Sequence, residues 1–218
     1  MKVQPLYAVP LITAEHPEAE QLCPVLREFF LAREGDAYRD DIVRDTQVGQ
    51  VFESRFDLFY WPDPELKPLV GFINATLART VMQLNGYTQA QLDTFRFHYH
   101  AWYHITRAGG FQSTHNHPNA SWSGIFCVDP GEPASDPREG TVRFFDPRGN
   151  SDFYSDPGNQ NLQAPFSHGG TQVTHQPGRL VIFPSYLMHE VFPYLGEKPR
   201  VIVAFNCWIT TDQDRVGY

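Results

Sequence analysis

The sequence predicts a mainly β protein with helical additions, in which N-terminal helices pack on one sheet of an antiparallel sandwich or barrel. From Phe95 onward, short aromatic and β-branched runs are separated by Gly, Pro, Asp and Asn, which is typical of such sheets. The preceding part carries apolar residues at helical spacing. The 218 residues suit one domain. We expect a helix-rich part at residues 1–94 and a β core at residues 95–210.

Two amphipathic helices and one shorter piece are expected in the first part. The first covers residues 17–33, where Pro17 begins a helical turn and Pro24 interrupts the pattern. The second covers residues 64–84 and stops at Asn85-Gly86. The third covers residues 88–94. The second helix has the clearest apolar stripe, formed by Leu69, Val70, Ile73, Leu77, Val81 and Leu84.

Seven strands are expected in the second part, where apolar runs are bounded by turn residues. They lie near residues 95–107, 121–128, 140–145, 171–175, 178–183, 188–193 and 199–209. The segment 146–170 is rich in Gly, Asn, Ser and Pro and is expected to be a long loop. Loops of this length in compact domains are often active-site lids or disordered segments.

The overall charge and the cysteines exclude several classes of protein. There are 17 Lys and Arg against 25 Asp and Glu, a formal charge of −8, and no basic run stands out, so nucleic acid is not expected as a partner. The first ten residues make a poor signal peptide, and no later run is long enough to span a membrane. Cys23, Cys127 and Cys207 lie apart in apolar stretches, which favours a reducing compartment, by default the cytoplasm.

The most informative pattern is a histidine pair, His115-Asn116-His117. Side chains in an extended strand alternate between faces, so two histidines one residue apart point the same way, with roots roughly 6.6 Å apart. A third imidazole from a distant strand, at His189, would complete a set of three ligands on an ion such as iron(II). The remaining coordination positions would stay open for oxygen and a chelating cosubstrate.

Arg200 lies on the strand expected to run back beside His189. Strand alternation places Arg200, Ile202, Ala204 and Asn206 on one face. If that face is the interior, the buried guanidinium needs an anion, and it can hold a carboxylate in a two-pronged geometry that a lysine cannot reproduce. A dicarboxylate that chelates the metal with its other end would supply this anion.

The ordered motifs resemble the 2-oxoglutarate and iron(II)-dependent oxygenase family, in a branch of bacterial and phage proteins, over roughly residues 99–209. The motifs are H-x-H-P followed by Ser123-Gly124, then Phe145-Asp146-Pro147-Arg148, Pro177-Gly178 before Leu180–Ser185, His189, Arg200 and Phe205-Asn206. The resemblance implies a double-stranded β-helix (jelly-roll, cupin-like) core that binds Fe(II) and uses 2-oxoglutarate as cosubstrate. It also implies that His115 and His189 are metal ligands and that Arg200 grips the far carboxylate of 2-oxoglutarate. Hydroxylation of a substrate is the expected reaction.

The sequence departs from the usual pattern at His117, where the wider superfamily has an aspartate. Three neutral histidines leave iron(II) with a charge of +2 instead of +1, which should strengthen its pull on dianionic 2-oxoglutarate. We expect His117 to be the third ligand because of its spacing. Carboxylates that compete for this role, without that spacing, are Asp129, Asp146 and Glu190.

Further residues are candidates around the site. The resembled family tends to have a tryptophan and a polar residue two positions later, so Trp102 and His104 are expected to border the cosubstrate, as is Asn206; surface imidazoles are an equal alternative on this strand. Other polar candidates near the site, without an assigned role, are Ser123, Arg143 and Arg148.

Two other functions stay open at this point. Gly109 followed by H-x-H imitates part of the cupin pattern, but that pattern wants a glutamate where the chain has Ser121 and Trp122. A cupin-like metal-binding protein would not need Arg200. A non-catalytic jelly-roll binding module would need neither metal nor His189. The substrate, a small molecule or a peptide, is not identified by the sequence, and the oligomeric state, including a homodimer, stays open.

Overall fold

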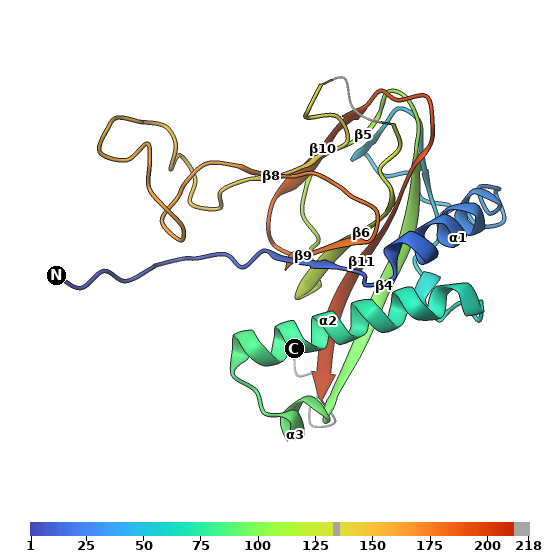
Figure 1. Ribbon diagram of the computed structural model, residues 1–218, viewed down its shortest axis with the longest axis horizontal. Coiled ribbons are helices and arrows are strands. Elements are labelled where there is room, and N and C mark those ends of the chain that lie inside the picture. Colours follow the sequence, from blue (N-terminus) through green and yellow to red (C-terminus); the bar gives the residue numbers. More distant parts are fainter. Residues whose placement is uncertain (133–135, 212–218) are drawn as a thin grey trace.

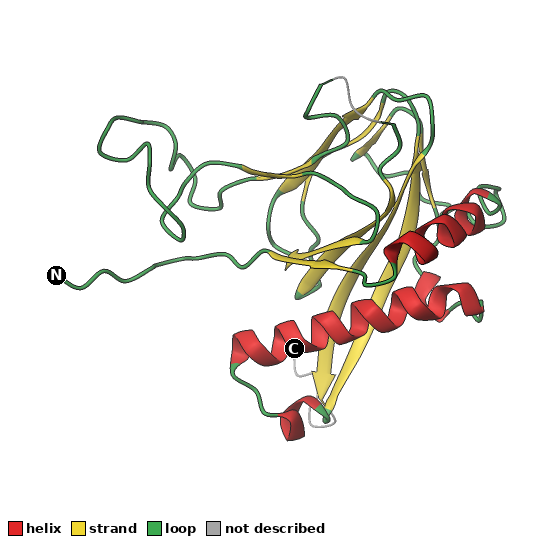
Figure 2. Ribbon diagram, in the orientation of Figure 1, coloured by secondary structure: helices red, strands yellow, loops and turns green. Residues whose placement is uncertain are grey.

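Two antiparallel sheets and a layer of helices on one side form the fold (Figures 1 and 2). The structure, a computed structural model, describes residues 1–132 and 136–211. The larger sheet has the strand order β1-β9-β6-β11-β4-β3, and the smaller has the order β2-β5-β10-β7-β8. This arrangement confirms the prediction of a mainly β fold with helical additions.

The strands have the following bounds. The larger sheet contains β1 (Ile12–Glu15), β3 (Val51–Glu53), β4 (Phe95–Thr106), β6 (Trp122–Asp129), β9 (Arg179–Pro184) and β11 (Arg200–Thr211). The smaller sheet contains β2 (Gln47–Val48), β5 (Gly110–His115), β7 (Val142–Phe144), β8 (Thr171–Val173) and β10 (His189–Tyr194).

The helices lie close to where the sequence predicts them. They are α1 (Ala19–Leu31), the 3-10 turns η1 (Leu58–Tyr60) and η2 (Pro64–Leu66), α2 (Lys67–Asn85) and α3 (Gln89–Leu92). Gly86 ends α2 in the left-handed region with φ +70°, as the Asn85-Gly86 stop predicts. Among the described residues, no helix is both long and apolar enough to span a bilayer.

Alternation along β4 and β11 separates two cores. One face of these strands, with Tyr103 of β4 and Phe205 of β11, packs under the helices against residues such as Phe30. The opposite face, with Trp102 and Ile202, points between the two sheets. β4 and β11 pair along their whole length, from Arg200 opposite Thr106 to Thr211 opposite Phe95. The helices therefore cover one side of the larger sheet and leave its other face free to line an internal site.

All seven predicted strands form, but four others were not predicted. These are β1, β2, β3 and β5. The first three span two to four residues, too few to show a periodic pattern. β5 reads Gly-Phe-Gln-Ser-Thr-His and contains one large apolar residue, so its sequence lacks the alternation of a half-buried strand. The expected long loop, 146–170, lies between β7 and β8 and projects away from the sheets (Figure 1).

Candidate metal centre

Three histidines, two on neighbouring strands of the smaller sheet and one just after β5, converge on a cavity that residues of both sheets line. His115 ends β5, His189 begins β10, and the two residues face each other across the antiparallel pair. His117 follows two residues after His115, and its backbone N–H donates to Ser185 O at 2.9 Å. One ligand nitrogen from each ring lies within 4.8 Å of the others, close to the roughly 4 Å that two metal bonds of about 2 Å can span. The structure therefore brings together the three side chains that the sequence singled out.

Backbone carbonyls fix the orientation of two of these rings. Nδ1 of His115 lies 2.6 Å from Ser113 O, and Nδ1 of His189 lies 2.9 Å from Leu187 O. A carbonyl oxygen only accepts, so each Nδ1 carries the proton and each Nε2 keeps a free lone pair. This is the tautomer that a metal-ligating histidine requires.

Asn206 holds the third ring. Asn206 Nδ2 lies 3.4 Å from His117 Nδ1, and Asn206 Oδ1 accepts from the Ser123 hydroxyl at 2.7 Å. The hydroxyls of Ser123 and Ser185 lie 2.8 Å apart. Rotating the amide by half a turn exchanges its oxygen and nitrogen at these contacts. In that orientation Asn206 accepts the Nδ1 proton of His117 and leaves Nε2 free. Asn206, expected beside the cosubstrate, thus contacts a candidate metal ligand.

The alternative carboxylate ligands are engaged elsewhere. Asp129 accepts from Arg27 at 2.7 Å, and Asp146 pairs with Arg148 at 2.6 Å. Glu190 pairs with Arg143 at 2.7 Å and accepts from Thr114 at 2.8 Å. Arg143 and Arg148, offered by the sequence as polar groups of the site, are accordingly held in ion pairs with these carboxylates.

Burial keeps the three imidazoles neutral. It lowers the pKa of His115, and with the neighbouring imidazoles it lowers the pKa of His117 to about 2. Burial and the adjacent His115 lower the pKa of His189 to about 3. Neutral rings are the form that binds a metal ion.

These shifts predict that the metal-free protein loses stability as the pH falls below about 6.5. The folded-state pKa values of His117 and His189 lie below their unfolded values, so the unfolded chain takes up protons first. The free energy of unfolding should fall by about 2 kcal/mol per histidine between pH 7 and pH 5. Urea unfolding at both pH values, in the presence of a chelator, measures this change. His189→Gln should show a smaller pH dependence than the unchanged chain, and an equal dependence would contradict the assignment.

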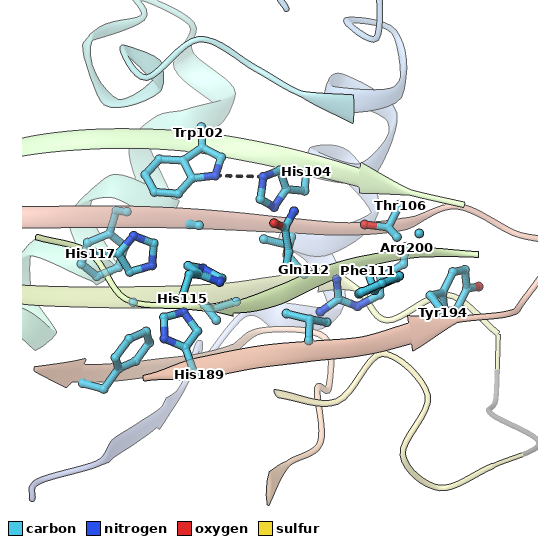
Figure 3. Close-up of a pocket in the computed structure, with 18 residues that line it drawn as sticks. Trp102, His104, Thr106, Phe111, Gln112, His115, His117, His189, Tyr194 and Arg200 are labelled. Carbon is cyan, nitrogen blue, oxygen red and sulfur yellow. Dashed lines mark hydrogen bonds between the residues drawn. The ribbon is translucent and has the colours of Figure 1, made fainter. Parts of the chain in front are cut away.

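A cavity extends from the three histidines to Arg200 (Figure 3). We call it the central cavity. The strands β4, β5, β10 and β11 supply most of its walls, which include Trp102, His104, Thr106, Gln112, Tyr194 and Arg200. Trp102 and His104 thus lie on the inward face of β4, and Arg200 lies on the inward face of β11.

Arg200 is a buried cation with no counter-ion among residues 1–132 and 136–211. Its exposed fraction is 3%, and its Nε has no hydrogen-bond partner in the part of the chain that the structure describes. The neighbours that affect the pKa of its guanidinium are the Cys127 thiol and the Tyr194 hydroxyl, and burial lowers that pKa. Gln112 Nε2, another buried donor in the cavity wall, also lacks a partner within the described ranges. A buried guanidinium of this kind is stabilised by an anionic ligand.

A chain of charged residues that the sequence did not reveal supports the part of the wall that β4 forms, next to β11. Glu53 Oε2 lies 2.7 Å from His104 Nε2, and Glu53 is itself 6% exposed. Its other oxygen pairs with Arg44, which also pairs with Asp40 at 2.8 Å. The Trp102 indole N–H lies 3.1 Å from the same His104 nitrogen. Glu53 sits on the three-residue strand β3, where no periodic signal could have identified it.

Comparison with known proteins agrees with this geometry. Residues 100–206 match the model of a family described as "Putative 2OG-Fe(II) oxygenase". No curated protein shows significant sequence similarity to the chain.

Several solved structures share the fold. A prolyl-4-hydroxylase of Pseudomonas putida is 14% identical, with a TM-score of 0.57 over 90% of this chain and 91% of the other. A prolyl hydroxylase of Trichoplax adhaerens, solved with a hypoxia inducible factor peptide fragment, is 10% identical, with a TM-score of 0.61 over 91% and 83%. HygX of Streptomyces hygroscopicus, solved with nickel, 2-oxoglutarate and hygromycin B, is 12% identical, with a TM-score of 0.53 over 92% and 83%. At these identities the likeness establishes the jelly-roll fold, which confirms that prediction.

Proposed function

Because the chain belongs to the 2OG-Fe(II) oxygenase family through residues 100–206, we propose that His115, His117 and His189 hold its iron(II) and that Arg200 binds its 2-oxoglutarate. One observation carries this assignment. The central cavity has three neutral imidazoles at one end and, at the other, a buried guanidinium whose Nε has no partner in the described part of the chain. A dicarboxylate that chelates a metal with one end and pairs with arginine at the other matches both features.

The three histidines fit iron(II) by their chemistry. Imidazole is a suitable donor for iron, and three protein ligands leave positions for exchangeable groups. The proton on Nδ1 of His115 and His189 directs Nε2 of each ring toward the shared centre. Asn206, Ser123 and Ser185 restrain His117, so all three rings are oriented before an ion binds.

Arg200 fits the far carboxylate of 2-oxoglutarate. Its guanidinium offers five N–H donors in a fixed fork, and Gln112 Nε2, on β5 of the facing sheet, adds a donor that has no partner among the described residues. Trp102 and His104 lie on β4, next to β11 in the sheet of Arg200, and also line the cavity, in line with their expected place beside the cosubstrate. Iron and 2-oxoglutarate together supply the oxidative chemistry, in which oxygen converts 2-oxoglutarate to succinate and carbon dioxide and a substrate is hydroxylated.

The substrate is proposed only by class, as a small molecule or a peptide. The structural neighbours support both, since one was solved with a peptide fragment and another with hygromycin B. Next to His189, the side chains of Tyr186 and Met188 are 58% and 40% exposed, which leaves apolar surface beside the metal centre for a substrate. The net charge of −8 argues against nucleic acid. A cytoplasmic location stays a prediction, supported by three free, buried cysteines.

Turnover of the cosubstrate tests the proposed function. Purified protein incubated in air with iron(II), ascorbate and 2-oxoglutarate should form succinate, because oxygenases of this chemistry convert some cosubstrate even without substrate. Omitting iron, or replacing air with argon, should remove succinate formation. A chain that binds iron but forms no succinate with any tested small molecule or peptide would contradict the proposal.

Glu53→Ala is expected to raise the KM for 2-oxoglutarate about 10-fold, because His104 loses the carboxylate that holds its ring against the central cavity. Glu53→Gln keeps a hydrogen-bonding group at this place, so its KM for 2-oxoglutarate should lie between those of the unchanged protein and Glu53→Ala. Iron affinity should be unchanged, since Glu53 does not belong to the metal-binding cluster found among the described residues. Steady-state kinetics and iron titration check these outcomes, and an unchanged KM in Glu53→Ala would assign the ion pair a structural role only.

A further inference from the structure

A second cavity, which we call the rear cavity, lies behind Arg200. Its walls come from the β6–β7 and β8–β9 connections and include Gly140, Thr141, Thr174, His175 and Arg200. Arg200 lines the central cavity as well. The guanidinium is therefore shared by the two cavities.

His175 is a buried histidine whose ring nitrogens have no hydrogen-bond partner among the described residues. Its exposed fraction is 6%, and neither Nδ1 nor Nε2 has a hydrogen-bond partner within residues 1–132 and 136–211. A neutral imidazole has one N–H donor and one acceptor, and buried polar atoms are nearly always paired. His175 lies outside the metal centre, and the proposed reaction does not use it. Its two free nitrogens indicate a ligand in the rear cavity.

Arg200 supplies a second unpaired donor to the same space. Its Nε lacks a partner in the described part of the chain, and one carboxylate in the central cavity cannot take up all five N–H groups of a guanidinium. Gly140 allows this approach. It has φ +62°, and a Cβ there would lie 3.3 Å from Arg200 Cδ and Nε. A residue with a side chain would crowd the guanidinium at this point.

The charges around the rear cavity favour an anion over a cation. Burial, and after it the charges of Arg200 and Arg179, lower the pKa of His175. The two carboxylates in the wall bind backbone N–H groups, since Glu132 accepts from Glu197 N at 2.6 Å and Glu139 accepts from Asp136 N at 3.2 Å. Glu15 pairs with Arg179 at 2.7 Å. The charged groups that act on the His175 ring among the described residues are thus two guanidinium groups, which favours an anion there.

We propose that the rear cavity binds a small monovalent anion, a halide or a short carboxylate, between the His175 N–H and the Nε–H of Arg200. Such an ion accepts from both donors. It also places a negative charge beside the guanidinium that faces 2-oxoglutarate, so the two anions oppose each other's binding, and this coupling is reciprocal. This consequence rests on the proposed function, whereas anion binding itself does not.

Anomalous diffraction from crystals soaked in sodium bromide tests binding directly. We expect a bromide peak between His175 and Arg200 in the unchanged protein. His175→Gln retains a donor and should retain the peak, whereas His175→Leu should lose it. Unfolding measurements show whether each variant folds. They are made in sodium gluconate, because its anion is too large to serve as the small anion proposed for the rear cavity. Absence of the peak in the unchanged protein, or its persistence in a folded His175→Leu variant, would overturn the proposal.

Kinetics test the coupling with each of the two kinds of anion. Chloride and formate, each compared with gluconate at equal ionic strength, should raise the KM for 2-oxoglutarate about 3- to 10-fold in a saturable way, within the usual range of coupling between sites. His175→Leu should show no such rise. An equal rise in His175→Leu would mean direct competition in the central cavity and would refute the coupling. A protein with a bromide site but no succinate formation would instead contradict the proposed function alone.

Discussion

Changing His189 to glutamine is expected to lower iron affinity at least about 100-fold and to abolish succinate formation. His189 faces His115 across the β5–β10 pair, so the two side chains are held together by strand register. Mutation of a residue that only hydrogen-bonds to a metal ligand typically lowers metal affinity or activity 10- to 100-fold. Loss of one of the three ligands themselves should have a larger effect. Iron titration and succinate assays measure both effects.

Glutamine is chosen over alanine because His189 is also part of the core. The centroid of its ring lies 4.8 Å from that of the Phe183 ring and 5.7 Å from that of the Phe144 ring. Truncation to alanine would therefore leave a cavity and lower the free energy of unfolding by about 2–4 kcal/mol. His98→Gln is a matched control, since His98 lies at the start of β4 and bonds Thr210 at 2.8 Å. It should retain iron binding and turnover. If His189→Gln behaves like His98→Gln, the three histidines are not the metal site.

His117→Asp separates the charge of the site from its ligand count. Aspartate restores the arrangement usual in the wider superfamily, so iron should still bind, but the charge on the ion and its ligands falls from +2 to +1. The KM for 2-oxoglutarate should therefore rise, while iron affinity stays within about 10-fold of the unchanged protein. If His117→Asp loses iron altogether, the restraint on His117 by Asn206 matters more than the donor type.

The three histidines and Arg200 could be singled out from the sequence because short-range spacing indicates which side chains lie together. The one-residue spacing of His115 and His117 marks them as a pair, although β5 ends at His115 and His117 follows it, and strand alternation groups Arg200 with Ile202 and Ala204 on one face of β11. Both inferences depend on spacing over a few neighbouring residues. The helix α2 was predictable for a similar reason, since its stripe of six apolar residues and the Asn85-Gly86 stop are local signals.

Contacts between segments far apart in the chain were not predictable. Glu53 reaches His104 across 51 residues, and Ser123 reaches Asn206 across 83. The residues of β2 and β3 show no periodicity, and they become strands only because β5 and β4 provide an edge for pairing. His175 gives no sequence signal either, because its importance comes from its burial against Arg200, a residue 25 positions later.

Arg200→Met is expected to raise the KM for 2-oxoglutarate about 100-fold or more while iron affinity stays unchanged. Loss of one partner from a buried, hydrogen-bonded charge pair costs about 2–5 kcal/mol, and Arg200 is 3% exposed. Arg200→Lys keeps the charge but lacks the two-pronged geometry, so a loss of about 10-fold or more is expected. Kinetics at saturating iron measure both variants. A cupin-like metal protein would instead keep its metal-dependent activity in Arg200→Met.

The stability of Arg200→Met distinguishes a ligand-binding arginine from a structural one. A structural arginine is paired, and its removal leaves a buried partner without a counter-charge, which destabilises the fold. Arg200 forms no ion pair with any carboxylate in the described ranges, and its Nε is unpaired there. Replacing an unpaired buried charge by an apolar side chain of similar length should therefore maintain or raise the free energy of unfolding in the absence of ligand. Urea unfolding without 2-oxoglutarate checks this, and a loss of more than about 2 kcal/mol would show that Arg200 serves the fold rather than the cosubstrate.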